Sequence, residues 1–189
     1  MIILIGLPGS GKSTVGRQLA RKLSASFLDS DHLIEQRLGC SIREYFEREG
    51  EAAFRDVEEA VISETVLAFG ADRLTILATG GGAVIRENNR KLLRGAGQVI
   101  YLRSSPEDLY KRLRHDRNRP LLQGVDPMER LRELYAQRDP LYREASHFQI
   151  ETGRPSVATL VNLMITQLGL VSAPKSDPSS EIKPYDSHD

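Results

Sequence analysis

The sequence Gly6-Leu7-Pro8-Gly9-Ser10-Gly11-Lys12-Ser13-Thr14 decides the fold of this chain. It follows the apolar run Ile2-Ile3-Leu4-Ile5 and precedes a helical pattern that runs from Val15 to Leu23. A strand, a glycine-rich turn and a helix in this order are the context of the G-x-x-x-x-G-K-[ST] motif, the P-loop. Its glycines let the backbone aim N–H groups inward, and the helix dipole favours negative charge there. The stretch therefore predicts a phosphate site.

Each residue type in the motif has a predicted role toward a bound nucleotide. Lys12 would reach the β- and γ-phosphates and neutralise transferred charge, and Ser13 would ligate Mg²⁺. The residues expected to contact phosphate are Gly9, Ser10, Gly11, Lys12, Ser13 and Thr14. We therefore expect ATP as co-substrate and Mg²⁺ as cofactor.

Strand-like and helix-like segments alternate along the rest of the chain. The expected strands lie near residues 2–5, 26–28, 74–78, 98–102 and 147–150. Such alternation is typical of a parallel, doubly wound sheet. We expect an α/β, three-layer P-loop fold with a central parallel sheet of about five strands, helices on both faces and a mobile lid.

Length and composition favour one domain. The 189 residues, of which 40% are hydrophobic, suffice for one substantial core. We expect that core within residues 1–170, whereas residues 171–189 are rich in Ser, Pro, Asp and Lys and are predicted to form a disordered tail.

Charge and apolar content exclude several classes of protein. The formal net charge is zero, so the charge balance does not indicate a nucleic-acid or membrane partner. The single Cys40 excludes an intrachain disulfide and a cysteine metal cluster. No apolar stretch is long enough for a signal peptide or a membrane span, so we expect a cytoplasmic protein, and a monomer.

Two carboxylates follow the second expected strand, at Asp29 and Asp31. We expect the two carboxylates to serve different ligands, because ligands bind at this edge of open α/β sheets. We expect Asp29 on the metal side and Asp31 on the acceptor side. The alternative is that Asp31 simply caps a helix over residues 32–38.

A long helical region is predicted from Ser41 to about Phe69, interrupted near Gly50 and begun by a capping box at Ser41 and Glu44. Within it, Arg55 and Glu58 are three residues apart and share a helix face. They could form a surface ion pair or belong to a site, and periodicity leaves both interpretations open.

The run Gly80-Gly81-Gly82 follows the third expected strand. Three successive glycines are costly in chain entropy, and a plain turn needs only one or two. Close approach of the backbone to a ligand accounts for the excess, and a flexible hinge is the alternative.

Residues 111–120 form the most basic segment of the chain. Such a run is usually a solvated helix face. In a phosphate-binding chain it also suits a lid that closes over nucleotide and excludes water. We expect this lid at about residues 112–124.

Six motifs in order make the sequence resemble the shikimate kinase family from Met1 to about Leu168. They are residues 6–14, Leu-Asp-Ser-Asp at 28–31, Phe-Arg-x-x-Glu-Glu at 54–59, Thr-Gly-Gly-Gly at 79–82, Arg-Pro-Leu-Leu at 119–122 and Arg-x-Pro-Leu-Tyr at 138–142. The resemblance implies ATP-dependent phosphorylation of the 3-hydroxyl of shikimate, in the chorismate route to aromatic amino acids.

The resemblance also implies roles for individual residues. Lys12, Asp31 and Arg119 would be catalytic, with Arg119 in the lid, and Ser13 and Asp29 would hold the metal. The residues expected to bind ATP beyond the P-loop are Arg112, Arg119, Arg154 and Pro155. The residues expected to bind shikimate are Asp31, Arg55, Glu58, Gly80, Gly81, Gly82 and Arg138, and the acceptor region would span about residues 31–60.

Three other functions share parts of this pattern. A gluconate kinase would share the P-loop and lid, but Arg55 and Arg138 favour a carboxylate on a ring as the acceptor. A GTP-dependent switch would carry Asn-Lys-x-Asp and Asp-x-x-Gly, and neither occurs in the sequence. A nucleic-acid-dependent ATPase would need a basic surface with stacking aromatics, whereas this chain has zero net charge and no tryptophan.

Overall fold

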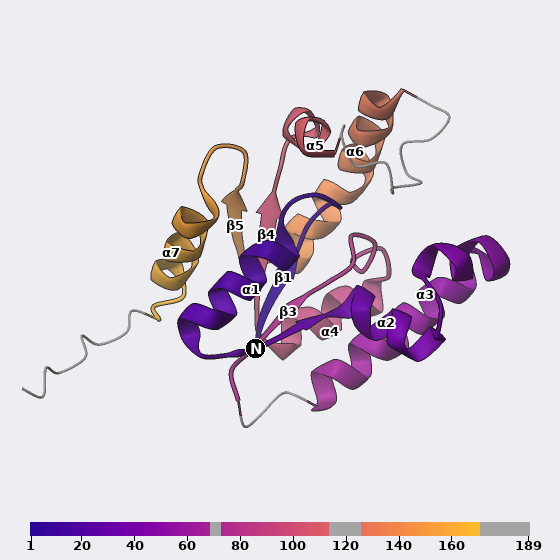
Figure 1. Ribbon diagram of the computed structural model, residues 1–189, viewed down its shortest axis with the longest axis horizontal. Helices are drawn as coiled ribbons and strands as arrows, with labels where there is room; N and C mark the ends of the chain where they lie inside the picture. The colour runs from indigo at the N-terminus through magenta and orange to yellow at the C-terminus, as the bar shows by residue number, and fades with distance from the viewer. Residues whose placement is uncertain (69–72, 114–125, 171–189) are drawn as a thin grey trace, which may run out of the picture.

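The computed structural model describes residues 1–68, 73–113 and 126–170 (Figure 1). In this part of the chain one parallel sheet has five strands in the order β2-β3-β1-β4-β5. The strands are β1 (Ile2–Ile5), β2 (Ser26–Asp29), β3 (Thr75–Ala78), β4 (Gln98–Arg103) and β5 (Phe148–Glu151). The expected α/β fold with a central parallel sheet is confirmed.

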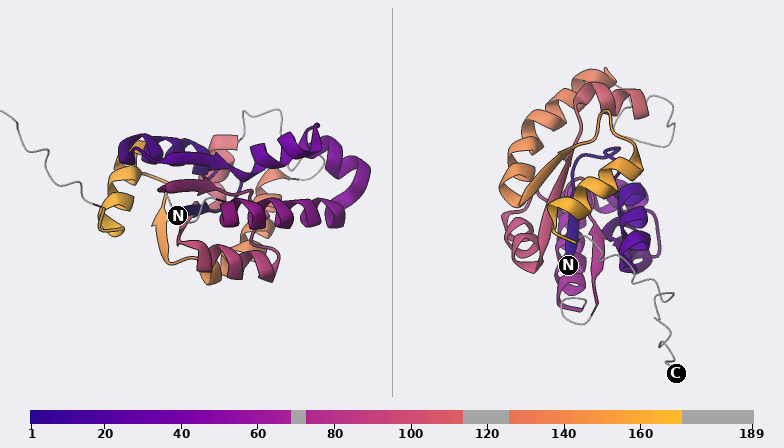
Figure 2. Two further views of the ribbon diagram at one scale, coloured as in Figure 1. Left: turned by 90° about the horizontal axis from the view of Figure 1, so that it is seen from below. Right: turned by 90° about the vertical axis from the view of Figure 1, so that its left-hand side faces the viewer.

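Helices cover both faces of the sheet. The helices are α1 (Lys12–Leu23), α2 (Ser30–Leu38), α3 (Ile42–Ala68), α4 (Glu87–Ala96), α5 (Pro106–Leu113), α6 (Pro127–Ala145) and α7 (Val157–Gln167). Ile2 and Leu4 of β1 pack toward α1 and α7, whereas Ile3 and Ile5 pack toward α3, α4, α5 and α6. Figure 2 shows helices on both faces of the sheet. Successive strand residues point to opposite faces, so β1 is buried on both sides and the molecule has three layers.

The carboxyl ends of β1, β2 and β3 meet at one edge of the sheet. The P-loop follows β1, and Asp29 at the end of β2 is in register with Ala78 at the end of β3. The glycine run continues from β3, so these three connections lie together. This edge is where open α/β sheets bind ligands.

Helix α3 is interrupted at Gly50, as expected, and begins with the predicted capping box. The backbone N–H of Ser41 donates to Glu44 over 3.1 Å, and that of Glu44 donates to the Ser41 hydroxyl over 3.2 Å. Gly50 has φ 83° and ψ 177°, a conformation that is nearly restricted to glycine. The bend separates the first turns of α3 from the segment that carries Arg55 and Glu58.

The alternative that Asp31 caps the helix was wrong. The chain enters α2 at Ser30, so Asp31 lies in the first turn of that helix. The cap of α2 is Asp29, whose side chain accepts a hydrogen bond from the Asp31 backbone over 3.1 Å. The two carboxylates therefore diverge because one caps the helix and the other lies in its first turn.

Two expectations lie outside the described residues: most of the lid, including Arg119, and the tail at 171–189. The domain boundary at about residue 170 stays a prediction. Among the helices of residues 1–68, 73–113 and 126–170, none is both long and apolar enough to cross a membrane.

Gly50→Ala should lower the free energy of unfolding by about 1–3 kcal/mol, because alanine is strained at this backbone conformation. Gly95→Ala in α4 is the matched control, since a Cβ has open space at both positions and only Gly50 has a positive φ. Gly95→Ala should be neutral or stabilising by up to about 1 kcal/mol. Thermal unfolding of the two variants checks this, and equal effects would contradict the assigned backbone geometry.

Candidate active site

The P-loop has the backbone that its sequence predicts. Gly9 and Gly11 adopt φ of 84° and 95°, which L side chains rarely do, and Gly11 leads directly into α1. The Lys12 ammonium donates to the carbonyl oxygens of Gly6 and Leu7 over 2.8 and 3.0 Å. The loop therefore keeps its lysine against its own backbone, at the position where phosphate groups are expected.

The side chains of Ser13, after β1, and Asp29, at the end of β2, are in contact. The Ser13 hydroxyl donates to the Asp29 carboxylate over 2.7 Å. A hydroxyl and a carboxylate oxygen beside a phosphate site suit Mg²⁺, which prefers oxygen ligands and keeps several waters and substrate phosphates. These two residues therefore fit a Mg²⁺ ion, and their role as metal ligands stays a prediction.

Asp31 lies in the first turn of α2, and its carboxylate packs against Gly80. Partial burial, with the charges of Asp29 and Glu58, raises its pKa to about 6, whereas Lys12 acts in the opposite direction. The carboxyl is therefore ionised at neutral pH but gains a proton in mild acid. An ionised carboxylate can accept a hydrogen bond from a substrate hydroxyl.

Arg55 and Glu58 form an internal ion pair, so the surface-pair interpretation is wrong. Their side chains are 2.5 Å apart, with only 11% and 1% of their areas exposed. Burial raises the pKa of Glu58, and the guanidinium of Arg55 opposes that change. A buried pair is a weak source of stability, because desolvation offsets much of the attraction. Its position at the sheet edge favours a role in binding.

The glycine run is explained by crowding. A Cβ at Gly80 would collide with the Asp31 carboxylate, one at Gly82 with the Arg55 guanidinium, and one at Gly81 would lie 2.5 Å from Pro8 Cδ. None of the three has a positive φ, so space and not conformation requires glycine here. The predicted close approach is thus made by the site's own side chains, and the hinge alternative is not needed.

Two contacts of this loop were missed from the sequence. The Gly80 N–H donates to the Ser30 hydroxyl over 2.9 Å, and the Tyr142 hydroxyl donates to the Gly81 carbonyl over 2.5 Å. Tyr142 could have been found, because it is four residues after Arg138 and so shares its helix face. Arg138 itself reaches the same carbonyl over 3.2 Å, which brings α6 to the glycine loop.

Arg112, one of the residues predicted to bind nucleotide, contacts both the P-loop and the loop after β5. Arg112 of α5 donates to the carbonyl of Thr152 and lies 3.5 Å from the carbonyl oxygens of Gly9 and Ser10. Arg154 is exposed and Pro155 half-buried on the same loop between β5 and α7. Arg112 therefore joins this loop to the P-loop, while Arg119 lies outside the described residues.

The comparisons with known proteins agree with this arrangement. A family model described as shikimate kinase matches residues 8–168. A shikimate kinase of Paracidovorax citrulli is 57% identical over 94% of this chain and 96% of the relative, and one of Ralstonia nicotianae is 53% identical over 96% and 95%.

A solved structure supports the same relationship. Shikimate kinase from Acinetobacter baumannii in complex with shikimate superimposes with a TM-score of 0.82 at 42% sequence identity. The match covers 91% of this chain and 94% of that one. Together with the two arginines and Asp31 that meet at the glycine loop beside a P-loop, these similarities show that the chain belongs to the shikimate kinase family.

Proposed function

We propose that this chain transfers the γ-phosphoryl group of ATP to the 3-hydroxyl of shikimate, giving shikimate 3-phosphate and ADP. One observation carries the proposal. Arg55 from α3 and Arg138 from α6 both contact the glycine loop, beside Asp31 and opposite the P-loop. Two planar guanidinium groups from distant segments suit a small carboxylate, and the nearby Asp31 suits its hydroxyl.

The residues divide into a donor half and an acceptor half. On the acceptor side, Asp31 accepts the hydrogen bond of the attacking hydroxyl, and Arg55 and Arg138 grip the carboxylate. Glu58 holds Arg55 in place through their 2.5 Å ion pair. Phosphoryl transfer has a loose transition state, so orientation of the hydroxyl matters more than full removal of its proton.

On the donor side, the P-loop N–H groups and Lys12 neutralise the phosphate charge that develops during transfer. Ser13 and Asp29 would hold Mg²⁺, which would supply further neutralisation of the phosphate charge. Arg112, Arg154 and Pro155 would flank the adenine, and Arg119 would reach the phosphates from the lid.

The metal identity, the monomeric state and the cytoplasmic location are part of this proposal. The oxygen ligands at Ser13 and Asp29 support Mg²⁺. The monomer and the cytoplasm remain expectations from the sequence.

An ADP-release assay with ATP and Mg²⁺ tests the reaction. Shikimate should support turnover, and gluconate and a nucleoside monophosphate should not. Lys12→Met should abolish turnover while circular dichroism stays unchanged, because the lysine neutralises transferred charge. Equal rates with gluconate, or near-normal activity of Lys12→Met, would contradict the proposal.

Arg138→Ala should raise the KM for shikimate about 10- to 100-fold, because a charge-assisted contact to the carboxylate is lost. The KM for ATP should change little. Arg130→Ala is the matched control on the same helix, since Arg130 is exposed and pairs with Glu133. Steady-state kinetics with each substrate varied separately checks both variants, and an unchanged shikimate KM in Arg138→Ala would exclude the clamp.

The raised pKa of Asp31 predicts opposite effects on activity and stability. Only the ionised form accepts the hydroxyl, so kcat/KM for shikimate should fall as the pH drops through about 6. A raised carboxyl pKa favours the protonated folded protein, so the free energy of unfolding should fall as the pH rises from 3.8 to about 6, and the full cost of the Asp31 charge is present above about 6.

At pH 8, Asp31→Asn should therefore lose most activity. Its free energy of unfolding should be equal to that of the unmodified protein or higher by up to about 1 kcal/mol, after allowance for solvent screening. If Asp31→Asn kept a normal kcat/KM and the same fall of kcat/KM in acid, another group would be responsible for that fall.

A further inference from the structure

The carbonyl of Gly81 accepts two hydrogen bonds from helix α6. The Tyr142 hydroxyl donates over 2.5 Å and Arg138 Nη1 over 3.2 Å. The arginine thus makes the longer of the two contacts, and the tyrosine makes the shorter one. The two donors differ in their proposed roles, because only Arg138 is proposed to contact the substrate.

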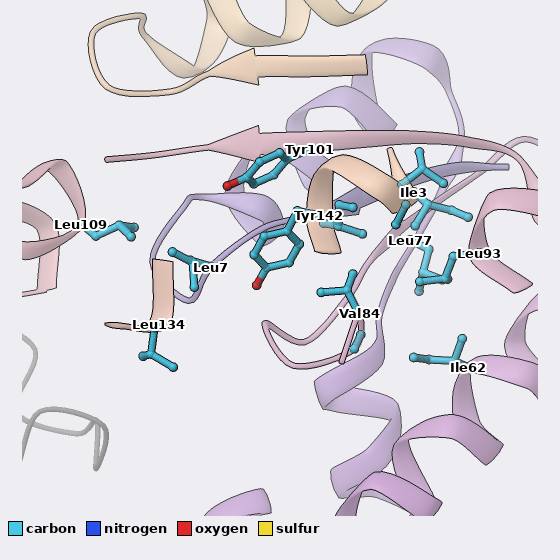
Figure 3. Packing of buried hydrophobic residues seen from close by; sticks show 14 of the residues in the cluster. Ile3, Leu7, Ile62, Leu77, Val84, Leu93, Tyr101, Leu109, Leu134 and Tyr142 are labelled. Atoms are coloured by element: carbon cyan, nitrogen blue, oxygen red, sulfur yellow. The ribbon is translucent and has the colours of Figure 1, made fainter. Parts of the chain in front are cut away.

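Tyr142 is fixed by its surroundings. It is fully buried, and its ring stacks on Tyr101 with 4.8 Å between centroids and 26° between planes (Figure 3). The Tyr101 hydroxyl in turn donates to Asp139 over 2.9 Å, and Asp139 also accepts from Arg143 over 2.6 Å. A ring held on its face and through its neighbour has little freedom to turn its hydroxyl away.

The Tyr142 hydroxyl also keeps its proton, and so remains a hydrogen-bond donor, around neutral pH. Burial raises the pKa of Tyr142, although the nearby Arg138 acts in the opposite direction. A protonated phenol can donate to a carbonyl, so the hydrogen bond to Gly81 is kept around neutral pH.

These contacts matter when substrate binds. Arg138 gives one of its N–H donors, on Nη1, to the Gly81 carbonyl. When that donor turns to a substrate carboxylate, the part-buried carbonyl loses one partner, and this loss would oppose substrate binding. Tyr142 removes the cost because its bond to Gly81 remains.

We propose that Tyr142 is a positioning residue that holds the glycine loop and thereby frees Arg138 to exchange the Gly81 carbonyl for the substrate carboxylate. This role rests on the proposed function. It assigns Tyr142 no contact with substrate and places its effect on the affinity for the acceptor, not on the transfer step.

Tyr142→Phe tests the role, since it removes the hydroxyl and keeps the stacked ring. The KM for shikimate should rise about five- to tenfold, the value of one hydrogen bond, with kcat within about twofold and the KM for ATP unchanged. Tyr101→Phe is the matched control: it removes the hydroxyl of the other ring in the same stack, which bonds Asp139 and not Gly81. It should leave the shikimate KM unchanged.

The same substitution in an Arg138→Ala background separates positioning from general destabilisation. There the effect of Tyr142→Phe on shikimate KM should shrink to about twofold or less, since no guanidinium competes for the carbonyl. An unchanged KM in Tyr142→Phe, an equal rise in Tyr101→Phe, or a full effect without Arg138 would each overturn the proposal. Failure of the unmodified enzyme to phosphorylate shikimate would instead overturn the proposed function.

Discussion

The close packing of side chains against Gly80, Gly81 and Gly82 is the constraint on which the rest of the site depends. Asp31, Pro8 and Arg55 occupy the space that Cβ atoms would need at these three positions. They come from the α2, P-loop and α3 segments, so the loop after β3 is the common surface against which both halves of the site are assembled. A larger residue at any of the three would displace a side chain proposed to bind or orient a substrate.

Negative and positive side chains lie near one another around this loop. Asp31 and Glu58 are carboxylates whose pKa values are raised by burial, and Lys12 and Arg55 lie close enough to counter that change. Such an arrangement contributes little net stability, because desolvation of each charge offsets its attraction to the next. It does provide an electrostatic environment that is organised before substrate arrives, which is the main requirement of phosphoryl transfer.

The sequence predicted much of this site because its chemistry lies in short, local patterns. The P-loop requires glycine at specific turns and a lysine next to the helix start, so residues 6–14 identify both a structure and a ligand class. The capping box of α3 and its break at Gly50 are equally local. The pairing of Ser13 with Asp29 could be expected, since Ser13 follows β1 and Asp29 ends β2 in one parallel sheet.

What the sequence by itself determined is therefore the order of strands and helices, the phosphate site and the residue types available to bind an acceptor. Tertiary structure decided that the Arg55 and Glu58 pair is internal, since helix periodicity describes a face and not what packs against it. It also decided that Asp31 lies in a helix and that Tyr142 shares the Gly81 carbonyl with Arg138. These contacts join segments up to 61 residues apart, and only the packing of α6 and α3 against one sheet edge brings them within hydrogen-bonding distance.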